Sequence, residues 1–264
     1  MPGLVVFGIT GRMGQSLVRA LRETEALSLC GAIASPGSSR LGRDAASDGA
    51  PTGVAITDDP YPALQGAAVA VDFSVPQCVA ANARACAQSG VPLLVGTTGF
   101  DAASRAALES AATRIPVLIA PNTSVGVSVM AKLVSLAAQA LGPAYDVEIF
   151  EAHHRTKRDA PSGTALALGE TVARARGQAL ASVAVFDRHG AAAAPETGSI
   201  GFAVLRAGDI VGEHTVTFAG GGERIEITHR ATDRITFARG ALRAAEWLVG
   251  QPAGLYGMED VVGN

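Results

Sequence analysis

The stretch Gly8-Ile9-Thr10-Gly11-Arg12-Met13-Gly14 directly follows the apolar run at residues 4–7 and opens a helical pattern. Glycines at these positions let the backbone turn tightly and approach a pyrophosphate, and the helix start presents unpaired N–H groups to the anion. The spacing is G-x-x-G-x-x-G rather than G-x-G-x-x-G, so the strand–turn–helix context carries the argument. The stretch predicts a dinucleotide-binding loop; the alternative is a plain glycine turn.

Further short apolar runs alternate with helical patterns through the first half of the chain. Each run is nearly continuous in apolar residues, as strands buried on both faces are. The runs are residues 28–33, 69–73, 91–95 and 116–119, and the helical patterns are 11–23, 76–88 and 101–113. This alternation predicts a Rossmann-like parallel sheet.

The pattern changes near residue 124. Helices are expected at 125–141 and 162–176, with a strand at 145–153 between them. Three extended segments follow, at 199–206, 209–218 and 223–229, and Ala-Gly-Asp at 207–209 and three glycines at 220–222 separate them. Such turns predict antiparallel neighbours. The expected fold is α/β, with an N-terminal Rossmann-like parallel sheet and a C-terminal mixed α/β domain on a largely antiparallel open sheet.

The composition excludes several classes of protein. The 264 residues are 48% hydrophobic and 17% charged, which provides a large core and rules out intrinsic disorder. A net charge of -3 and 5% aromatic residues argue against a nucleic-acid surface. The chain opens without a signal-peptide pattern, and Pro and Gly break its long uncharged stretches, so no membrane partner is expected. Three cysteines without a C-x-x-C are expected to be small buried side chains in a reducing, cytoplasmic setting.

The end of the second strand should meet the adenosine ribose, where a carboxylate binds the 2′-hydroxyl of NADH. The chain there is Ala34-Ser35-Pro36-Gly37-Ser38-Ser39-Arg40, and the first carboxylate is Asp44. Small hydroxyl residues, together with Arg40 and Arg12, favour a 2′-phosphate. The sequence therefore leans toward NADPH and leaves NADH open; a surface loop without selectivity is the alternative.

Two further turns follow strands at the same edge of the expected sheet. They are Gly96-Thr97-Thr98-Gly99-Phe100 and Ala120-Pro121-Asn122-Thr123. Asn and Thr side chains can bind a carboxamide or a ribose, although ordinary turns use the same residues. Their shared location at the carboxyl ends of strands favours nucleotide contacts.

The segment from Glu151 to Thr164, E-A-H-H-R-T-K-R-D-A-P-S-G-T, is the richest in chemistry. Two of the five histidines and three basic residues fall within 153–158, which suits a small polyanionic substrate. Ser162 is a candidate N-cap, and the N–H groups behind it can cradle a carboxylate. Adjacent histidines on opposite strand faces make a poor chelate, so no metal is expected. The alternative is a solvated charged loop.

Lysine is rare in this chain. Only Lys132 and Lys157 are lysines among the 21 basic residues. A site that needs only charge would hold Arg here, whereas Lys can release a proton, so Lys157 is a candidate proton donor. Lys132 lies in a helical pattern without evident chemistry. The other histidines, which are His189, His214 and His229, are expected to be surface or hydrogen-bonded sheet residues.

Taken together, these motifs resemble the 4-hydroxy-tetrahydrodipicolinate reductase (dihydrodipicolinate reductase) family. The resemblance runs along the whole chain and rests on G-x-x-G-R-M-G at 8–14, D-F-S at 72–74, G-T-T-G-F at 96–100, N-x-S-V-G-V at 122–127, E-A-H-H-R-x-K-x-D-A-P-S-G-T-A at 151–165 and R-A-G-D-I-V-G-E-H at 206–214. It implies NAD(P)H-dependent reduction of 4-hydroxy-tetrahydrodipicolinate to tetrahydrodipicolinate, with loss of water, in lysine biosynthesis through diaminopimelate. It also implies a homotetramer joined through the C-terminal sheets.

The resemblance also assigns domains and residues. It implies a dinucleotide-binding domain over 1–124, completed by 234–264, and a substrate-binding and oligomerisation domain over 125–233. His153 and Lys157 would be the acid/base pair. The dicarboxylate would be held by His154, Ser162, Gly163 and Thr164. The nucleotide would lie along Gly8, Ile9, Thr10, Gly11, Arg12, Met13, Ala34, Ser35, Gly96, Thr97, Thr98, Ala120, Pro121, Asn122 and Thr123.

Two positions depart from the family pattern. Many relatives carry an acidic residue followed by Arg where this chain has Ala34 and Ser35, and a common Phe is replaced by Thr123.

Two rival functions stay open. An NAD(P)-dependent amino-acid dehydrogenase of the aspartate or diaminopimelate type would need a site for a free amino acid, which nothing outside 151–164 suggests. A dinucleotide-sensing regulator would need a basic DNA-binding element, and none is visible.

Overall fold

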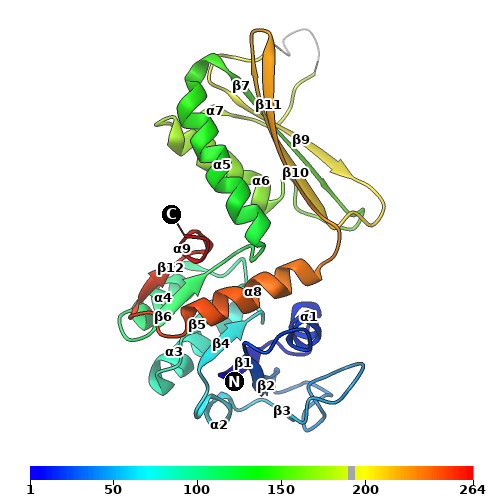
Figure 1. The fold of residues 1–264 in the computed structure, drawn as a ribbon, viewed down its shortest axis with the longest axis vertical. Helices are drawn as coiled ribbons and strands as arrows, with labels where there is room; N and C mark the ends of the chain where they lie inside the picture. The colour runs from blue at the N-terminus through cyan, green and yellow to red at the C-terminus, as the bar shows by residue number, and fades with distance from the viewer. Residues whose placement is uncertain (190–193, 264) are drawn as a thin grey trace. The chain divides into compact units, whose positions relative to one another are not determined.

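The chain forms two compact units in the computed structural model, which describes residues 1–189 and 194–263 (Figure 1). Unit 1 comprises Met1–Val125 and Ile235–Asn264, and unit 2 comprises Gly126–Arg234. The Ala-rich tract at 191–194, which the sequence predicts to be a variable loop, lies outside the described residues except for its last position.

Unit 1 is built on a seven-stranded sheet in which every pairing is parallel. In sheet order the strands are β12 (Gly254–Tyr256), β6 (Pro116–Ile119), β5 (Leu93–Val95), β4 (Val69–Asp72), β1 (Gly3–Phe7), β2 (Ser28–Ile33) and β3 (Ile56–Thr57). The parallel sheet confirms the prediction from the alternating apolar runs. The edge strands β3 and β12 were not predicted, because two and three residues are too short to show a pattern.

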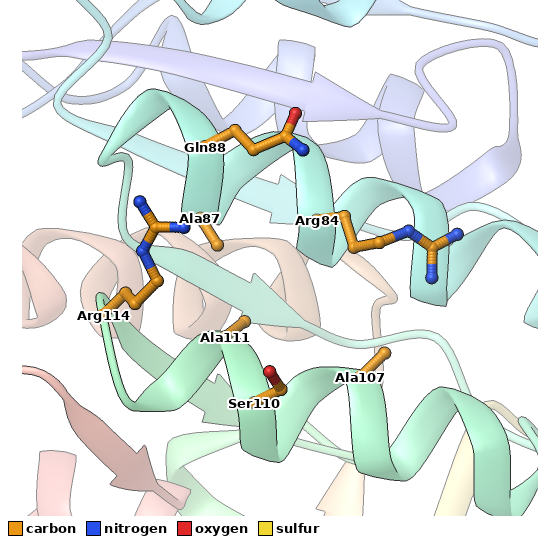
Figure 2. Close-up of a pocket in the computed structure, with 7 residues that line it drawn as sticks. All are labelled: Arg84, Ala87, Gln88, Ala107, Ser110, Ala111 and Arg114. Carbon is orange, nitrogen blue, oxygen red and sulfur yellow. The ribbon is translucent and has the colours of Figure 1, made fainter.

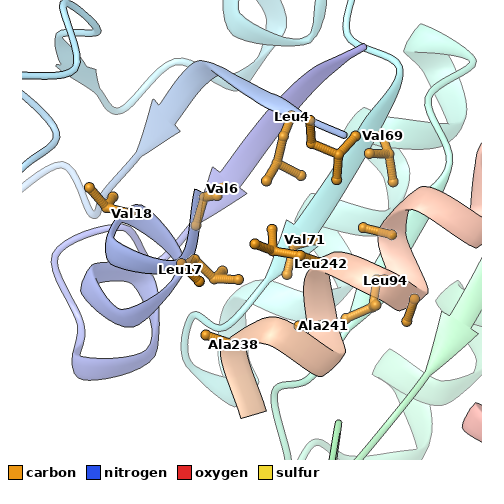
Figure 3. Close-up of a cluster of buried hydrophobic side chains, with 14 of the residues drawn as sticks. Leu4, Val6, Leu17, Val18, Val69, Val71, Leu94, Ala238, Ala241 and Leu242 are labelled. Atoms are coloured by element: carbon orange, nitrogen blue, oxygen red, sulfur yellow. The ribbon is translucent and has the colours of Figure 1, made fainter. Parts of the chain in front are cut away.

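Helices cover both faces of this sheet. One face is covered by α1 (Arg12–Leu21), α8 (Ile235–Leu248) and α9 (Met258–Val261), and the other by α2 (Pro60–Leu64), α3 (Val79–Ser89, after the 3₁₀ turn η1, Pro76–Cys78) and α4 (Ala102–Ala112). Strand β1 shows the division, since Leu4 and Val6 enter the first core and Val5 and Phe7 the second. Figure 3 shows the first core, where α1 and α8 pack against β1 and β4.

Helix α8 packs against the end of β6 at very short range. The hydroxyl of Thr123 donates to the carbonyl of Phe237 at 2.7 Å. A Cβ at Gly240 would overlap the carbonyl oxygen of Thr123, so only glycine fits at this crossing. Fully buried alanines of α8, including Ala238 and Ala241, let the rest of the helix approach the sheet.

Unit 2 holds a five-stranded mixed sheet. In order, its strands are β11 (Glu223–Ala231), β10 (Gly212–Gly220), β7 (Asp146–His153), β9 (Ile200–Arg206) and β8 (Ala184–Val185). The pairings of β11 with β10 and of β10 with β7 are antiparallel, whereas those of β7 with β9 and of β9 with β8 are parallel. The α/β class with a parallel N-terminal sheet and a mixed C-terminal one is confirmed.

The hairpin expected at residues 207–209 is wrong. Strand β7 lies between β9 and β10, so those two strands are not neighbours. The turn residues bond to the end of β7 instead: Ala207 donates to the carbonyl of His153 at 3.0 Å, and Arg155 donates to that of Gly208 at 3.2 Å. Turn residues specify a change of direction, not the partner of the next strand.

One face of this sheet is covered by helices. They are α5 (Val125–Leu141), α6 (Gly163–Ala175) and α7 (Leu180–Val183), with the 3₁₀ turn η2 (Gly142–Ala144) after α5. Buried side chains of α5 and α6 meet Ile149 and Phe218 in one core. No helix of the described residues contributes to a core on the opposite face, where Phe150 is 40% exposed.

Helix α5 together with η2 is long and apolar enough, by length and composition alone, to cross a membrane. Lys132 lies near the middle of this stretch, and a lysine at the centre of a bilayer costs about 3 kcal/mol. A single helix of this kind is weak support for a membrane span.

The three cysteines are all free. Cys86 is buried, and burial raises the pKa of its thiol, as expected for a small core side chain. The same expectation is wrong for Cys30, which is exposed, while Cys78 is half-buried. Strand β2 places Cys30 near the start of the strand, outside the core.

We expect Gly240→Ala to lower the free energy of unfolding by about 1–3 kcal/mol, because the added methyl overpacks the contact between α8 and Thr123. Alanine is the better helix former by about 1 kcal/mol, so only the close contact can produce this sign. The matched control is Gly221→Ala, where a Cβ has open space. Urea unfolding measures both. A Gly240→Ala protein at least as stable as the wild type would show that the contact is not limiting.

Candidate active site

The first site region lies where the strand order of unit 1 reverses, between β1 and β4. Open α/β sheets bind ligands at the carboxyl ends of strands at such a point. Gly8 has φ +78°, and a Cβ there would overlap the carbonyl of Phe73. A Cβ on Gly14 would lie 2.5 Å from the Gly8 oxygen. Gly11 is the N-cap of helix α1, which has no side-chain cap and no acidic residue in its first turn, so this cradle fits a pyrophosphate.

The predicted loop residues divide by burial. Ile9 is fully buried in the core, so only its backbone can meet a nucleotide. Met13 is half-buried and packs on the same core. Thr10 and Arg12 are exposed. Arg12 therefore supplies a solvent-accessible cation beside the cradle.

The first carboxylate after β2, that of Asp44, is already used by hydrogen bonds within its own loop. It accepts hydrogen bonds from its own loop, from Thr52, Ala46 and Gly53, and these bonds lower its pKa to about 2. Arg40 donates to the carbonyls of Asp44 and Ala46 at 2.9 Å, so its guanidinium is largely used by the same loop. Ala34 is buried and Ser35 is exposed. The closed Asp44 loop was not visible in the sequence.

Asp72 ties the predicted nucleotide turn at 96–100 to the end of β4. Its carboxylate is fully buried at the end of β4 and accepts from the Ser74 N–H at 2.8 Å and from the Thr97 hydroxyl at 2.9 Å. Asn82 donates to its other oxygen at 2.8 Å. The backbone N–H groups of residues 96 and 97 donate to the Asp72 carbonyl. The sequence singled out D-F-S only as part of a resemblance; a carboxylate that ends an apolar strand was the available signal.

The last predicted nucleotide turn is largely tied into the fold. Ala120 is buried and donates to Val95 at 2.9 Å, and Asn122 Oδ1 accepts from the Ser124 N–H at 2.9 Å. The hydroxyl of Thr123 is bonded to α8, so only its backbone can serve a nucleotide. Pro121 and Thr98 are exposed.

The second site region lies at the end of β7 in unit 2, around Glu151. This side chain is 1% exposed, and Arg206 donates to both of its oxygens, at 2.7 and 2.6 Å. His153 Nδ1 lies 2.6 Å from Oε2, and the Ser162 N–H donates to Oε1 at 2.9 Å. Burial acts to raise the pKa of Glu151, but the bonds from Arg206, His153 and Ser162 together hold it below its usual value.

His153 is nearly buried, with 12% of its side chain exposed. Burial lowers the pKa of its imidazole and outweighs the opposing effect of Glu151, and the cations Lys157 and Arg206 lower it further. Its Nε2 lies against the backbone of Gly212, where an added Cβ would be only 3.1 Å away. The lowered pKa favours the neutral ring, and Nε2 lies beside Gly212, the first residue of β10.

Lys157 follows in the turn after β7. Its Nζ lies 2.8 Å from the Asp159 carboxylate, a pairing that the sequence did not indicate and that lowers the pKa of Asp159. The Arg206 guanidinium donates to the Asp159 carbonyl at 2.7 Å and so links this turn to Glu151. His154 lies beyond the strand, and its Nδ1 is 2.8 Å from the Thr156 hydroxyl. These contacts place His153 and Lys157 in one hydrogen-bonded network. His154 bonds to Thr156 instead.

Ser162 is the N-cap of α6, as predicted. Its hydroxyl accepts from the Ala165 N–H at 3.2 Å and lies 2.9 Å from His214 Nε2. His214 is 3% exposed. Its pKa is lowered to about 4, mainly by burial and to a smaller extent by the nearby His153. His214 is a hydrogen-bonded sheet residue, but its contact with Ser162 was missed, as was the role of Arg206. Gly163 is exposed at the helix start.

A shallow groove between α3 and α4 is a poorer candidate (Figure 2). It is lined by Arg84, Ala87, Gln88, Ala107, Ser110, Ala111 and Arg114. Helices that connect parallel strands run antiparallel to those strands. The last turns of α3 and α4 therefore lie at the amino ends of the strands. The groove is therefore away from the edge where this fold class binds nucleotides.

Comparisons with known proteins agree along the whole chain. Two family models match, "Dihydrodipicolinate reductase, N-terminus" at residues 3–123 and "Dihydrodipicolinate reductase, C-terminus" at residues 126–262. A 4-hydroxy-tetrahydrodipicolinate reductase of Thiobacillus denitrificans is 52% identical over 98% of this chain and 98% of its own length. One of Anaeromyxobacter dehalogenans is 51% identical over 100% and 98%.

A solved structure agrees with the sequence comparisons. Dipicolinate-bound dihydrodipicolinate reductase from Paenisporosarcina sp. TG-14 is 25% identical, covers 98% of this chain and 99% of its own, and has a TM-score of 0.78.

We expect Asp72→Asn to weaken binding of a reduced dinucleotide about tenfold, because an amide nitrogen replaces one acceptor and weakens the side-chain network that holds Thr97. The fluorescence of the bound nicotinamide reports the Kd. Asp58→Asn, at an exposed position of the same unit, is the control and should leave the Kd unchanged. Equal Kd values for Asp72→Asn and the wild type would remove Asp72 from the binding region.

Proposed function

The chain belongs to the dihydrodipicolinate reductase family, and on that premise we propose that it reduces 4-hydroxy-tetrahydrodipicolinate to tetrahydrodipicolinate. A reduced nicotinamide dinucleotide is the reductant, and the 4-hydroxyl leaves as water. The network around Glu151 carries the proposal: His153 and Ser162 bond to Glu151, and Arg206 links it to the turn in which Asp159 pairs with Lys157. It places proton-transfer groups beside a helix start that can hold an anion.

The substrate is a ring with two carboxylates. We assign one carboxylate to the start of α6, where the N–H groups of Gly163 and Thr164 follow the capping Ser162. His154 and the exposed cations Arg155 and Arg158 add positive charge to this part of unit 2. The dipicolinate bound to the Paenisporosarcina reductase has the same pair of carboxylates and is a suitable probe.

The cofactor is assigned to the cradle of unit 1. When bound there, the reduced nicotinamide supplies the hydride. The N–H groups at the start of α1 hold the pyrophosphate, and Gly8 and Gly14 keep the backbone close enough for this contact. Asp72 holds the turn that contains Thr97 and Thr98.

Proton delivery is assigned to Lys157 and His153. Hydride addition leaves a carbanion-like ring that must take up a proton, and the Lys157 ammonium is the donor that completes the reduction. Asp159, at 2.8 Å, holds the ammonium in the turn after β7. His153, neutral through burial, is the partner that accepts and returns a proton.

The activity test couples the protein to a synthase that forms the substrate from pyruvate and aspartate semialdehyde. The expected result is substrate-dependent oxidation of the reduced dinucleotide, followed by its absorbance. Folded protein that oxidises none would overturn the proposal. Turnover also excludes the dinucleotide-sensing regulator, and absence of activity with free aspartate or diaminopimelate excludes the dehydrogenase.

We expect Lys157→Arg to lower kcat at least about a hundredfold, since Arg keeps the charge but does not release a proton. The KM for substrate should change little, because the cation is preserved. Arg158→Lys, the reverse exchange at the next position, is the matched control and should retain most of kcat. Near-normal turnover by Lys157→Arg would refute the assignment of the proton donor.

NADPH is the proposed cofactor, since Arg12 is exposed beside the cradle and Asp44 is closed into its own loop. We expect Arg12→Gln to lower kcat/KM for NADPH about tenfold and to leave that for NADH within about twofold, as loss of one charge-assisted bond predicts. Arg19→Gln, in the last turn of the same helix, is the control. A wild-type protein that prefers NADH would reject the assignment.

A homotetramer joined through the sheets of unit 2 is also proposed. Support comes from the uncovered sheet face, where Phe150 and Leu205 are 40% and 42% exposed and Thr215 bonds to Thr228. Light scattering on the eluted protein should give four times the chain mass, and Phe150→Asp should lower it. A monomer at micromolar concentration would reject the tetramer. A cytoplasmic location is proposed with it, from the biosynthetic role of the family.

A further inference from the structure

Glu151 occupies the centre of the site in unit 2. It lies directly across from His214 on β10 and from Val204 on β9. Its carboxylate is 1% exposed and receives four hydrogen bonds, which is about its full capacity. A buried carboxylate needs this saturation, because an unpaired charge away from water is strongly unfavourable.

The direction of the bond to His153 follows from chemistry. An ionised carboxylate only accepts hydrogen bonds, and the pair with Arg206 keeps Glu151 ionised. His153 Nδ1, at 2.6 Å, must therefore carry the proton. In the neutral ring the proton-free nitrogen is then Nε2, the atom that lies against Gly212.

The other oxygen of Glu151 fixes the anion cradle. Oε1 accepts the backbone N–H of Ser162, the residue that caps α6. Arg206 donates to both oxygens and so fixes the orientation of the whole carboxylate. The bond to His153 and the bond to Ser162 therefore cannot move independently. One rigid group thus sets the distance between a proton-accepting nitrogen and the start of a helix.

We propose that Glu151 is a positioning residue that holds His153 in the tautomer with a bare Nε2 and fixes this nitrogen relative to the carboxylate cradle of α6. The inference rests on the proposed function for the identity of the bound dicarboxylate. Glu151 touches neither substrate nor cofactor in this role. It acts through His153 and Ser162.

The first test needs no substitution. In ¹⁵N NMR spectra of the wild-type protein, above the pKa of His153, the His153 ring should show a protonated Nδ1 and a bare Nε2. A spectrum with the proton on Nε2 overturns the inference, whether or not the protein is an active reductase. Failure of the enzyme assay with the expected tautomer overturns the proposed function alone.

The second test is Glu151→Gln, with Glu148→Gln as matched control on the opposite face of the same strand, where Glu148 pairs with Arg188. We expect Glu151→Gln to mix the two tautomers of His153 and to lower kcat/KM about tenfold to a hundredfold. The Kd for dipicolinate should rise at least about threefold, because the start of α6 is released. Glu148→Gln should change none of these.

The pH profile gives a readout that a purely structural role would not move. His153 is faced by Glu151 on its own strand, His214 on β10, Arg206 on β9 and Lys157 in the following turn. Among these, only Glu151 raises the pKa of His153. Its loss must lower that pKa, so the acid limb of kcat/KM should move to lower pH in Glu151→Gln. An unmoved limb with a single unchanged tautomer would sink the proposal.

Discussion

The buried carboxylate of Glu151 is the constraint on which unit 2 depends. Once a strand carries an ionised group to the covered face of a sheet, donors must surround it. Arg206 donates from its charged guanidinium, His153 from a ring N–H and Ser162 from its backbone N–H. The end of β7, the end of β9 and the start of α6 are thereby held at one point, and the chemistry of the site is assembled by the need to satisfy one side chain.

Unit 1 also contains a buried carboxylate, that of Asp72, and neutral groups donate its hydrogen bonds. Asp72 also ends a buried strand, but its donors are a hydroxyl, an amide and a backbone N–H. The Asp72 network therefore has no cation among these donors, unlike the one around Glu151. Both units place a buried carboxylate at the carboxyl end of a strand, and in both it organises the loop that follows.

Sequence reasoning succeeded where the signal is local and repeated. Runs buried on both faces predicted the parallel strands, and Ser162 before an apolar helix predicted the cap. It failed where partners are distant. Arg206 lies 55 positions from Glu151, and His214 lies 52 positions from Ser162. Nothing local to these residues indicates which strands will become neighbours, which is also why the turn at 207–209 was misread as a hairpin.

The discontinuity of unit 1 has a consequence for synthesis on the ribosome. Strands β1 to β6 are made first, but α8, which closes one face of their sheet, and β12, which completes its edge, follow all of unit 2. Unit 2 is a continuous segment and can complete its core while the earlier strands still expose the surface that Ala238, Ala241 and Leu242 will cover. The nascent chain thus carries an open apolar sheet until the segment from Ile235 onward emerges. The face left open until then is the one shown in Figure 3.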